Sequence, residues 1–209
     1  MIRQQIKNSY FALNRWLVKP NTLLARLRYR RASDAEGFYL HLGSGPVYIP
    51  GMINIEGNIM RRKDLWLDLQ NPLPFPDRSV YFVYCSHTLE HFYPDEAMQL
   101  LREIHRVLRD DGVARIATPS FEHALEIAAG HPAEDPQRAF SDPHGQAIDY
   151  LFCDGQHKYA YSFTVMERFA RDAGFTGITN HSADPAPKRY GKIEVGDELA
   201  GSLIVELRR

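Results

Sequence analysis

Residues 80–118 of this 209-residue chain read VYFVYCSHTLEHFYPDEAMQLLREIHRVLRDDGVARIAT. Two short apolar runs, Val80–Cys85 and Val113–Thr118, are typical of buried strands. Between them, Pro94–Leu108 places its apolar residues at helical spacing, and Asp110-Asp111-Gly112 predicts a turn into the second strand. A strand, a helix and a strand in this order predict a parallel crossover. The stretch therefore indicates an open α/β sheet.

Further strands, a helix and loops are predicted on both sides of this unit. Residues 121–160 form a polar and aromatic insertion, in which loops at the carboxyl edge of the sheet would decide substrate choice. Residues 180–201 are expected to form a polar loop. The remaining predicted elements are the strands Phe38–Leu42, Met52–Glu56, Leu65–Leu69, Phe175–Thr179 and Ser202–Leu207, and the helix Ser162–Ala173.

Composition limits the class of protein. A length of 209 residues fits one domain with small appendages, and a 44% apolar content supports a packed core. The N-terminus lacks the features of a signal peptide, no apolar run is long enough to cross a bilayer, and the two cysteines suit a reducing compartment. These features predict a cytoplasmic protein.

Charge divides the chain into two parts. Residues 1–31 contain eight basic residues and no acid, a charge of +8. The rest of the chain must then carry −9 to give the net charge of −1. An acidic body predicts no binding of nucleic acid, because such proteins carry basic patches interleaved with aromatics. We therefore divide the chain into a basic amphipathic helical arm, residues 1–36, and a domain, residues 37–209.

The arm has two interpretations. Ile2, Ile6, Tyr10, Leu13 and Leu17 recur at helical spacing, Pro20 interrupts the pattern, and a second short helix is expected from Asn21 to Arg31. These helices either pack their apolar stripe on the domain or lie on an anionic membrane or a partner, for which Trp16 beside basic residues is suited.

Glycines and acids follow the first predicted strands. The first strand opens directly into Gly43-Ser44-Gly45, and glycines at the carboxyl edge of a parallel strand let a ligand approach the backbone closely. Glu56 ends the second strand, where such folds hold the two hydroxyls of a ribose. Asp68 follows in the third strand. Two carboxylates suit a ribose diol and an exocyclic amine.

Several runs together resemble the class I S-adenosylmethionine-dependent methyltransferases, closest to small methyltransferase-like proteins linked to surface-glycan biosynthesis. The resemblance covers about residues 38–180 and implies a Rossmann-like open sheet of seven strands in the order 3-2-1-4-5-7-6, with S-adenosylmethionine as cofactor. The runs that carry it are LGSGP (42–46), PGMINIE (50–56), DL (68–69), LPFPDRSV (73–80), LEH (89–91) and LREIHRVLRDDG (101–112).

The resemblance also implies site residues. Gly43, Ser44 and Gly45 would line the methionine part of the cofactor, and Glu56 would accept hydrogen bonds from the ribose. Asp68 and Leu69 would face the adenine, while Ser86 and His87 would border the sulfonium and the acceptor.

The acceptor side rests on histidines and a tyrosine. A neutral imidazole can take a proton from an acceptor hydroxyl, and His157 is the preferred base because it precedes a helix with Tyr159 beside it. His87 is the second catalytic candidate. The substrate-binding candidates are His91, His144 and Tyr159.

Two further readings remain. The run His87-Thr88-Leu89-Glu90-His91 fits the His-x-x-Glu-His pattern of zinc proteases, but it leaves a strand instead of lying in a long helix, so the sequence predicts no metal. Only residues 46–51 separate the first two strands, too few for a covering helix.

Taken together, the sequence features predict methyl transfer to an oxygen or nitrogen of a glycan or small metabolite. The alternative is a non-catalytic binding or regulatory module.

Overall fold

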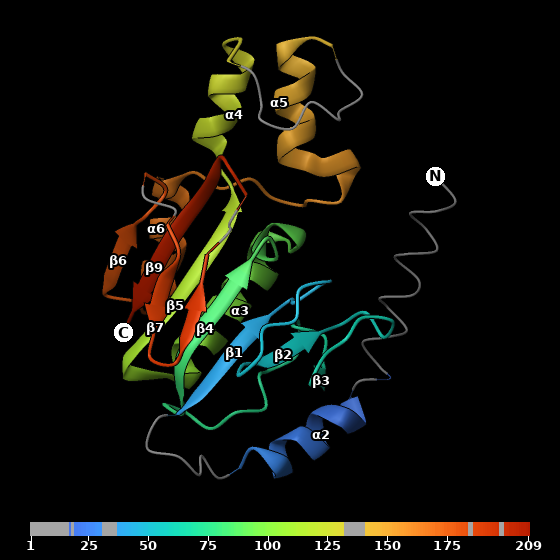
Figure 1. Ribbon diagram of the computed structural model, residues 1–209, viewed down its shortest axis with the longest axis vertical. Coiled ribbons are helices and arrows are strands. Elements are labelled where there is room, and N and C mark those ends of the chain that lie inside the picture. Colours follow the sequence, from blue (N-terminus) through green and yellow to red (C-terminus); the bar gives the residue numbers. More distant parts are fainter. Residues whose placement is uncertain (1–16, 18, 31–36, 132–140, 184–185, 197–198) are drawn as a thin grey trace.

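The computed structural model describes residues 17, 19–30, 37–131, 141–183, 186–196 and 199–209. Its main sheet has seven strands in the order β3-β2-β1-β4-β5-β9-β6, which confirms the predicted order and the α/β class (Figure 1). The strands are β1 Phe38–Leu42, β2 Ile53–Glu56, β3 Leu65–Trp66, β4 Val80–Ser86, β5 Leu108–Pro119, β6 Gly177–Asn180, β7 Lys188–Tyr190, β8 Ile193–Val195 and β9 Ser202–Arg208. The helices are α2 Lys19–Arg28, η1 Leu89–His91, α3 Pro94–Val107, α4 Phe121–Ala128, α5 Pro143–Phe152, η2 Cys153–Gly155 and α6 Phe163–Ala173.

The sheet is covered differently on its two faces. Strands β1 to β5 are parallel, and β9 is antiparallel to both β5 and β6. On one face, α3 and α6 bury Leu100, Ile104 and Met166 in the main core (Figure 1). On the other face, alternate strand residues such as Phe82 pack against Tyr190 of the β7–β8 hairpin, with ring centroids 4.1 Å apart.

That hairpin corrects the expectation of a polar loop over residues 180–201. Tyr190, Ile193 and Val195 are buried between charged neighbours, which is the period-two pattern of a strand lying on a sheet. The Tyr190 hydroxyl donates to Glu206 Oε1 in β9 at 2.5 Å. The hairpin takes the place of a covering helix on this face.

The junction between α3 and β5 also departs from expectation. Strand β5 begins at Leu108, so Asp110-Asp111-Gly112 lies inside the strand and not in a turn before it. The register shifts there, since Val80 pairs with Leu108 whereas Phe82 pairs with Val113. Extra residues on one strand of a pair are a bulge, and a Cβ at Gly112 would lie 2.9 Å from a backbone oxygen of β4.

A buried asparagine organises the short connection from β1 to β2. Asn54 Nδ2 donates to the Ile49 and Met52 carbonyls and to Asp64 Oδ2, at 2.9–3.1 Å. Its Oδ1 accepts from the Ile49 amide at 2.9 Å and from His41 Nδ1 at 3.1 Å. One side chain thereby holds the loop of residues 46–52 against both strands, without a helix.

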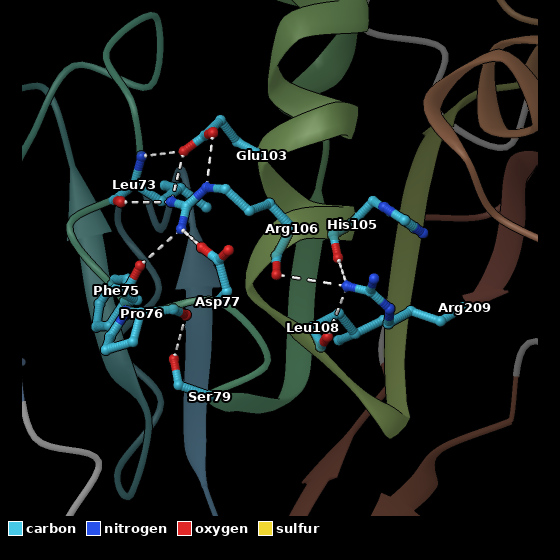
Figure 2. Close-up of polar contacts among 10 residues, drawn as sticks. All are labelled: Leu73, Phe75, Pro76, Asp77, Ser79, Glu103, His105, Arg106, Leu108 and Arg209. Atoms are coloured by element: carbon cyan, nitrogen blue, oxygen red, sulfur yellow. Dashed lines mark hydrogen bonds and ion pairs between the residues drawn. The ribbon is translucent and has the colours of Figure 1, made fainter.

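A second connection, from β3 to β4, is held by α3 (Figure 2). Arg106 donates to the carbonyls of Leu73 and Phe75 and to the carboxylates of Asp77 and Glu103. Glu103 Oε2 in turn accepts from the Leu73 amide at 2.8 Å. The most specific part of the family resemblance, LREIHRVLRDDG, therefore contributes the pair that fixes the LPFPD loop, which is a structural role.

The described part of the insertion after β5 is mainly helical. Helices α4 and α5 lie beyond the carboxyl ends of β4 and β5 and share a small core of Ala124, Ile127, Ala147 and Leu151 (Figure 1). This corrects the expectation of loops over residues 121–160. The Asp142 side chain caps α5 by accepting from the Gly145 amide at 2.8 Å, a start signal that was present in the sequence.

Helix α2 is the described part of the arm. It buries Ala25 in the main core, and the Tyr29 ring that follows it packs against Phe75 with centroids 4.9 Å apart. Its outer side exposes Leu23, Leu24 and Leu27 by 62–64%. The helix predicted over the first 17 residues lies, apart from Leu17, outside the described residues. Within the described part of the chain, no helix has the length and apolar content to span a membrane.

Candidate functional site

The loop after β1 is tightly constrained on one side and open on the other. Gly43 and Gly45 both have positive φ, which L-residues rarely adopt. A Cβ at Gly43 would lie 2.3 Å from Thr88 Oγ1, whereas a Cβ at Gly45 would meet nothing closer than 3.9 Å. Thr88 Oγ1 lies 3.4 Å from the Gly43 carbonyl, so the loops after β1 and β4 are in contact.

Glu56 lies at the end of β2 beside this glycine loop. Its Oε2 accepts from the Gly45 amide and its Oε1 from the Asn58 amide, both at 2.7 Å. Each carboxylate oxygen keeps a further lone pair, because a carboxylate can accept about four hydrogen bonds. Glu56 therefore anchors the glycine loop and can still accept from a diol.

Ser44 is the second feature that suits a ligand here. Its hydroxyl is buried and, among the described residues, has no hydrogen-bond partner. Buried polar groups without a partner are uncommon and need an explanation, such as a ligand. The side chains of Ser44 and Glu56 together fit the polar part of a nucleoside cofactor.

Asp68 and Leu69 follow β3, which is shorter than predicted and ends at Trp66. Leu69 is buried, and Asp68 is half-buried with its Oδ1 accepting from the Gln70 amide at 3.0 Å. Their place after the third strand matches the one expected for residues facing an adenine. Their contact with a base stays a prediction.

The loop after β4 turns sharply at the predicted acceptor side. Ser86 ends β4, and His87 adopts a positive φ of 47°, which redirects the chain into η1. His87 Nδ1 lies 3.4 Å from Glu90 Oε1. Its Nε2 lies 2.9 Å from the Ser202 hydroxyl, which itself donates to the Leu199 carbonyl.

His157 reaches the same place from a distant part of the chain. The amide of Lys158 donates to the Glu90 carbonyl at 2.7 Å, which fixes this segment against η1. His157 Nε2 lies 4.0 Å from Glu90 Oε1, and its ring meets His91 edge-on with centroids 4.9 Å apart. Burial lowers the pKa of His157, partly offset by the Glu90 charge, so the imidazole is neutral at neutral pH.

Two predicted substrate residues have side chains outside this cluster, although the Tyr159 amide donates to the Glu90 carbonyl at 3.3 Å. His144 is exposed on the first turn of α5. The Tyr159 ring packs on Phe169 with centroids 5.9 Å apart, which places it in the packing of α6. The structure thus brings together His87, His91 and His157, whereas His144 and Tyr159 have other surroundings.

The sequence analysis considered Glu90 only within the His-x-x-Glu-His run and did not place it among the candidate site residues. Its side chain is 1% exposed, and neither carboxylate oxygen has a hydrogen-bond partner among the described residues. The available signal was an acid between two histidines in the loop after a buried strand. Periodicity alone cannot tell that this acid points inward.

Comparison with protein families agrees with this geometry. Residues 53–116 match the family model described as a methyltransferase domain. The matched segment runs from β2 through most of β5 and includes Glu56 and Glu90. The match covers less than half of the chain and agrees with the methyltransferase-like strand order of the sheet. A search of curated protein sequences found no match.

Solved structures share the fold at low identity. A methyltransferase of Haloferax volcanii, in complex with the Trm112 methyltransferase activator, has a TM-score of 0.52 at 15% identity and covers 93% of this chain and 96% of its own. An S-adenosylmethionine-dependent methyltransferase of Archaeoglobus fulgidus has a TM-score of 0.51 at 14% identity, with 90% and 94% covered. At these identities the likeness establishes the fold.

Proposed function

We propose that this protein binds S-adenosylmethionine and transfers its methyl group to an oxygen or nitrogen atom of a glycan or small metabolite. The observation that carries the proposal is the pairing of the open Gly43–Gly45 loop with the Glu56 carboxylate. The methyltransferase-domain match over residues 53–116 supports it.

The cofactor half of the site is formed by β1, β2 and the segment after β3. Gly45 leaves room for the methionine part, Ser44 offers a free hydroxyl, and Glu56 accepts from the ribose diol. Asp68 and Leu69 face the adenine. The acidic side chains suit the positive charge of a sulfonium.

The acceptor half is formed by the loop after β4 and the segment of His157. When bound, the cofactor supplies an electrophilic methyl group for in-line displacement, chemistry that depends mainly on alignment and exclusion of water. Ser86 borders the reacting atoms. An imidazole of His87 or His157 takes the acceptor proton, and His91 contacts the acceptor.

The test is titration calorimetry with S-adenosylhomocysteine on wild type, Glu56→Gln and Glu56→Ala. We expect wild type to bind and Glu56→Ala to bind about 10–100-fold more weakly, because a charged acceptor of the ribose contributes ~1.5–3 kcal/mol. Glu56→Gln keeps the shape and removes the charge, so it separates the two effects. Asp172→Ala, an exposed acid on α6, is the matched control.

The outcomes separate the alternatives. Binding by wild type that survives in Glu56→Ala refutes the ribose assignment. If wild type does not bind S-adenosylhomocysteine, the proposal is refuted and the non-catalytic alternative is favoured. Glu56 also anchors the glycine loop. Circular dichroism of each variant therefore checks that changing this side chain has not unfolded the domain.

A further inference from the structure

Four titratable side chains, His87, Glu90, His91 and His157, lie close together around η1. His157 Nδ1 donates to the Leu151 carbonyl at 2.7 Å, and His91 Nδ1 donates to the Gln156 carbonyl at 3.2 Å. A carbonyl only accepts, so each Nδ1 carries the hydrogen and each Nε2 keeps a lone pair. Since the Ser202 hydroxyl donates elsewhere, His87 Nε2 carries a hydrogen and its Nδ1 lone pair faces Glu90.

Glu90 lies at the centre of this group with its charge uncompensated by hydrogen bonds. Both of its oxygens are buried and have no hydrogen-bond partner among the described residues, although His87 Nδ1 lies 3.4 Å from Oε1. Burying a carboxylate is costly unless a cation or hydrogen bonds compensate it. A proton on His87 would satisfy Oε1 alone and would leave the second oxygen and the lone pairs of His91 and His157 unused.

The remaining arrangement is that of a metal site. One donor atom each from Glu90, His91 and His157 lies within 4.8 Å of the other two. Histidines that bind metals usually donate their other ring N–H to a backbone carbonyl, as both of these do. His91 is exposed, which gives an ion an entry path.

We propose that Glu90, His91 and His157 bind one divalent transition-metal ion, Zn²⁺ by the chemistry of the donor set, beside the acceptor half of the site. Two imidazoles and one carboxylate form a known three-ligand zinc set that leaves a fourth position open. Donors of tetrahedral zinc lie about 3.3 Å apart, so the donors must move inward on binding, which the exposed His91 side chain can do. When the ion is bound, His91 and His157 are its ligands, and the roles proposed above for these two residues on the acceptor side do not apply.

This inference departs from the absence of metal predicted from the sequence. That prediction used only His87 to His91, whose positions after a strand do not match a zinc-protease helix. The additional ligand is His157, which comes from the far end of the insertion. The hydrogen bond from the Lys158 amide to the Glu90 carbonyl holds this segment beside Glu90.

The experiment measures zinc directly, so it does not depend on methyl transfer or cofactor binding. The full chain, freed of any affinity tag, is stripped with a chelator and titrated with ZnCl₂ by calorimetry, and metal content is measured by mass spectrometry. We expect one zinc per chain and a rise in melting temperature. His91→Ala should weaken zinc binding about 100-fold or more.

Matched variants keep the test decisive. His144→Ala removes an exposed histidine of α5 and should bind zinc as wild type does. Glu90→Gln keeps the size of the buried side chain, and it should lose zinc binding while the fold, checked by circular dichroism, persists. Wild type that takes up no stoichiometric zinc, or His91→Ala that binds it as tightly as wild type, overturns the proposal.

Discussion

Gly43 illustrates how one missing side chain sets the shape of a site. Its backbone has a φ of +65°, and the place of a Cβ is taken by the Thr88 side chain. Thr88 Oγ1 is in turn within 3.0 Å of the Ser86 carbonyl. The closeness of the loops after β1 and β4 therefore depends on a glycine at this position.

We expect Gly43→Ala to lower the free energy of unfolding by about 3 kcal/mol or more, since it combines backbone strain with overlap of packed atoms. Gly45→Ala is the matched control, because its φ is also positive but its Cβ direction is open. That variant should lose only about 1–2 kcal/mol. Urea denaturation measures both, and equal losses would contradict the role given to Thr88.

His41 makes stability depend on pH. Burial lowers its pKa, and the hydrogen bond to Asn54 and the Glu56 charge only partly oppose this. The unfolded state then binds more protons than the folded state between the folded pKa and about 6.5. Stability should therefore fall as the pH drops below about 6.5, by at most about 1.4 kcal/mol per pH unit for this residue.

The test is urea denaturation between pH 7.5 and 5 of wild type and His41→Asn. Asparagine does not titrate and can still donate to Asn54 Oδ1, so its profile should be flatter. His144→Asn, an exposed histidine, should leave the wild-type profile unchanged. An identical slope in wild type and His41→Asn would exclude His41 as the source.

At the scale of elements, the pair Glu103 and Arg106 of α3 replaces a helix between β3 and β4. Arg106 donates to two loop carbonyls and to two carboxylates, and the carboxylates of Glu103 and Asp77, Glu103 most strongly, raise the pKa of Arg106 above its ordinary value. Through these contacts Arg106 holds the Leu73–Asp77 loop against α3.

We expect Arg106→Ala to lower the free energy of unfolding by about 2–3 kcal/mol, since hydrogen bonds to charged groups contribute ~1.5–3 kcal/mol and the loop carbonyls lose their donor. Arg102→Ala, one turn earlier and exposed, should change it by less than about 0.5 kcal/mol. Thermal denaturation followed by circular dichroism compares them. Comparable losses in the two variants would show that Arg106 acts only as a helix-surface residue.

Helices and strands with a strong local sequence pattern were predicted correctly, and those without one were missed. Strong periodicity predicted α3 and α6 to within a residue at each end, and the apolar runs predicted β1 and β4. The hairpin β7–β8 was missed because each strand has three residues and its apolar faces pack on a distant sheet. The bulge in β5 was read as a turn because Asp-Asp-Gly favours both.

The candidate site was predictable where it follows strand ends and not where it depends on tertiary contact. Glu56 and the glycine loop lie together as their positions after β1 and β2 required. Glu90 and His157 meet only because the insertion after β5 returns to η1, a path that no local pattern specifies.

The whole molecule combines an acidic domain with a basic arm. Helix α2 has one side packed on the domain and one side exposed. Tyr29, which follows the helix, is buried, while Leu23, Leu24 and Leu27 face solvent. We propose that these leucines, with the basic residues around them, contact anionic membranes at their surface. Attraction of up to about 1 kcal/mol per basic residue near the surface would weaken with salt.

We expect the full chain to sediment with phosphatidylglycerol vesicles at low salt and to release at high salt. Replacing Leu23, Leu24 and Leu27 with glutamine should abolish sedimentation and leave the melting temperature unchanged, because buried Ala25 and Tyr29 stay in place. Ile148→Gln, an exposed residue of α5, is the control. Unchanged sedimentation of the triple variant, or none in wild type, would exclude this role.

The short connection held by Asn54 has a consequence for how the chain folds. Paired residues of β1 and β2, such as His41 and Asn54, are 13 positions apart, whereas Arg115 and Glu206 of β5 and β9 are 91 apart. Closing the longer segment costs about 1.7 kcal/mol more in chain entropy. During synthesis we expect the β1–β2 pair to form while the C-terminal half is still being made, whereas β9, the C-terminal strand, can enter between β5 and β6 only after both have been made.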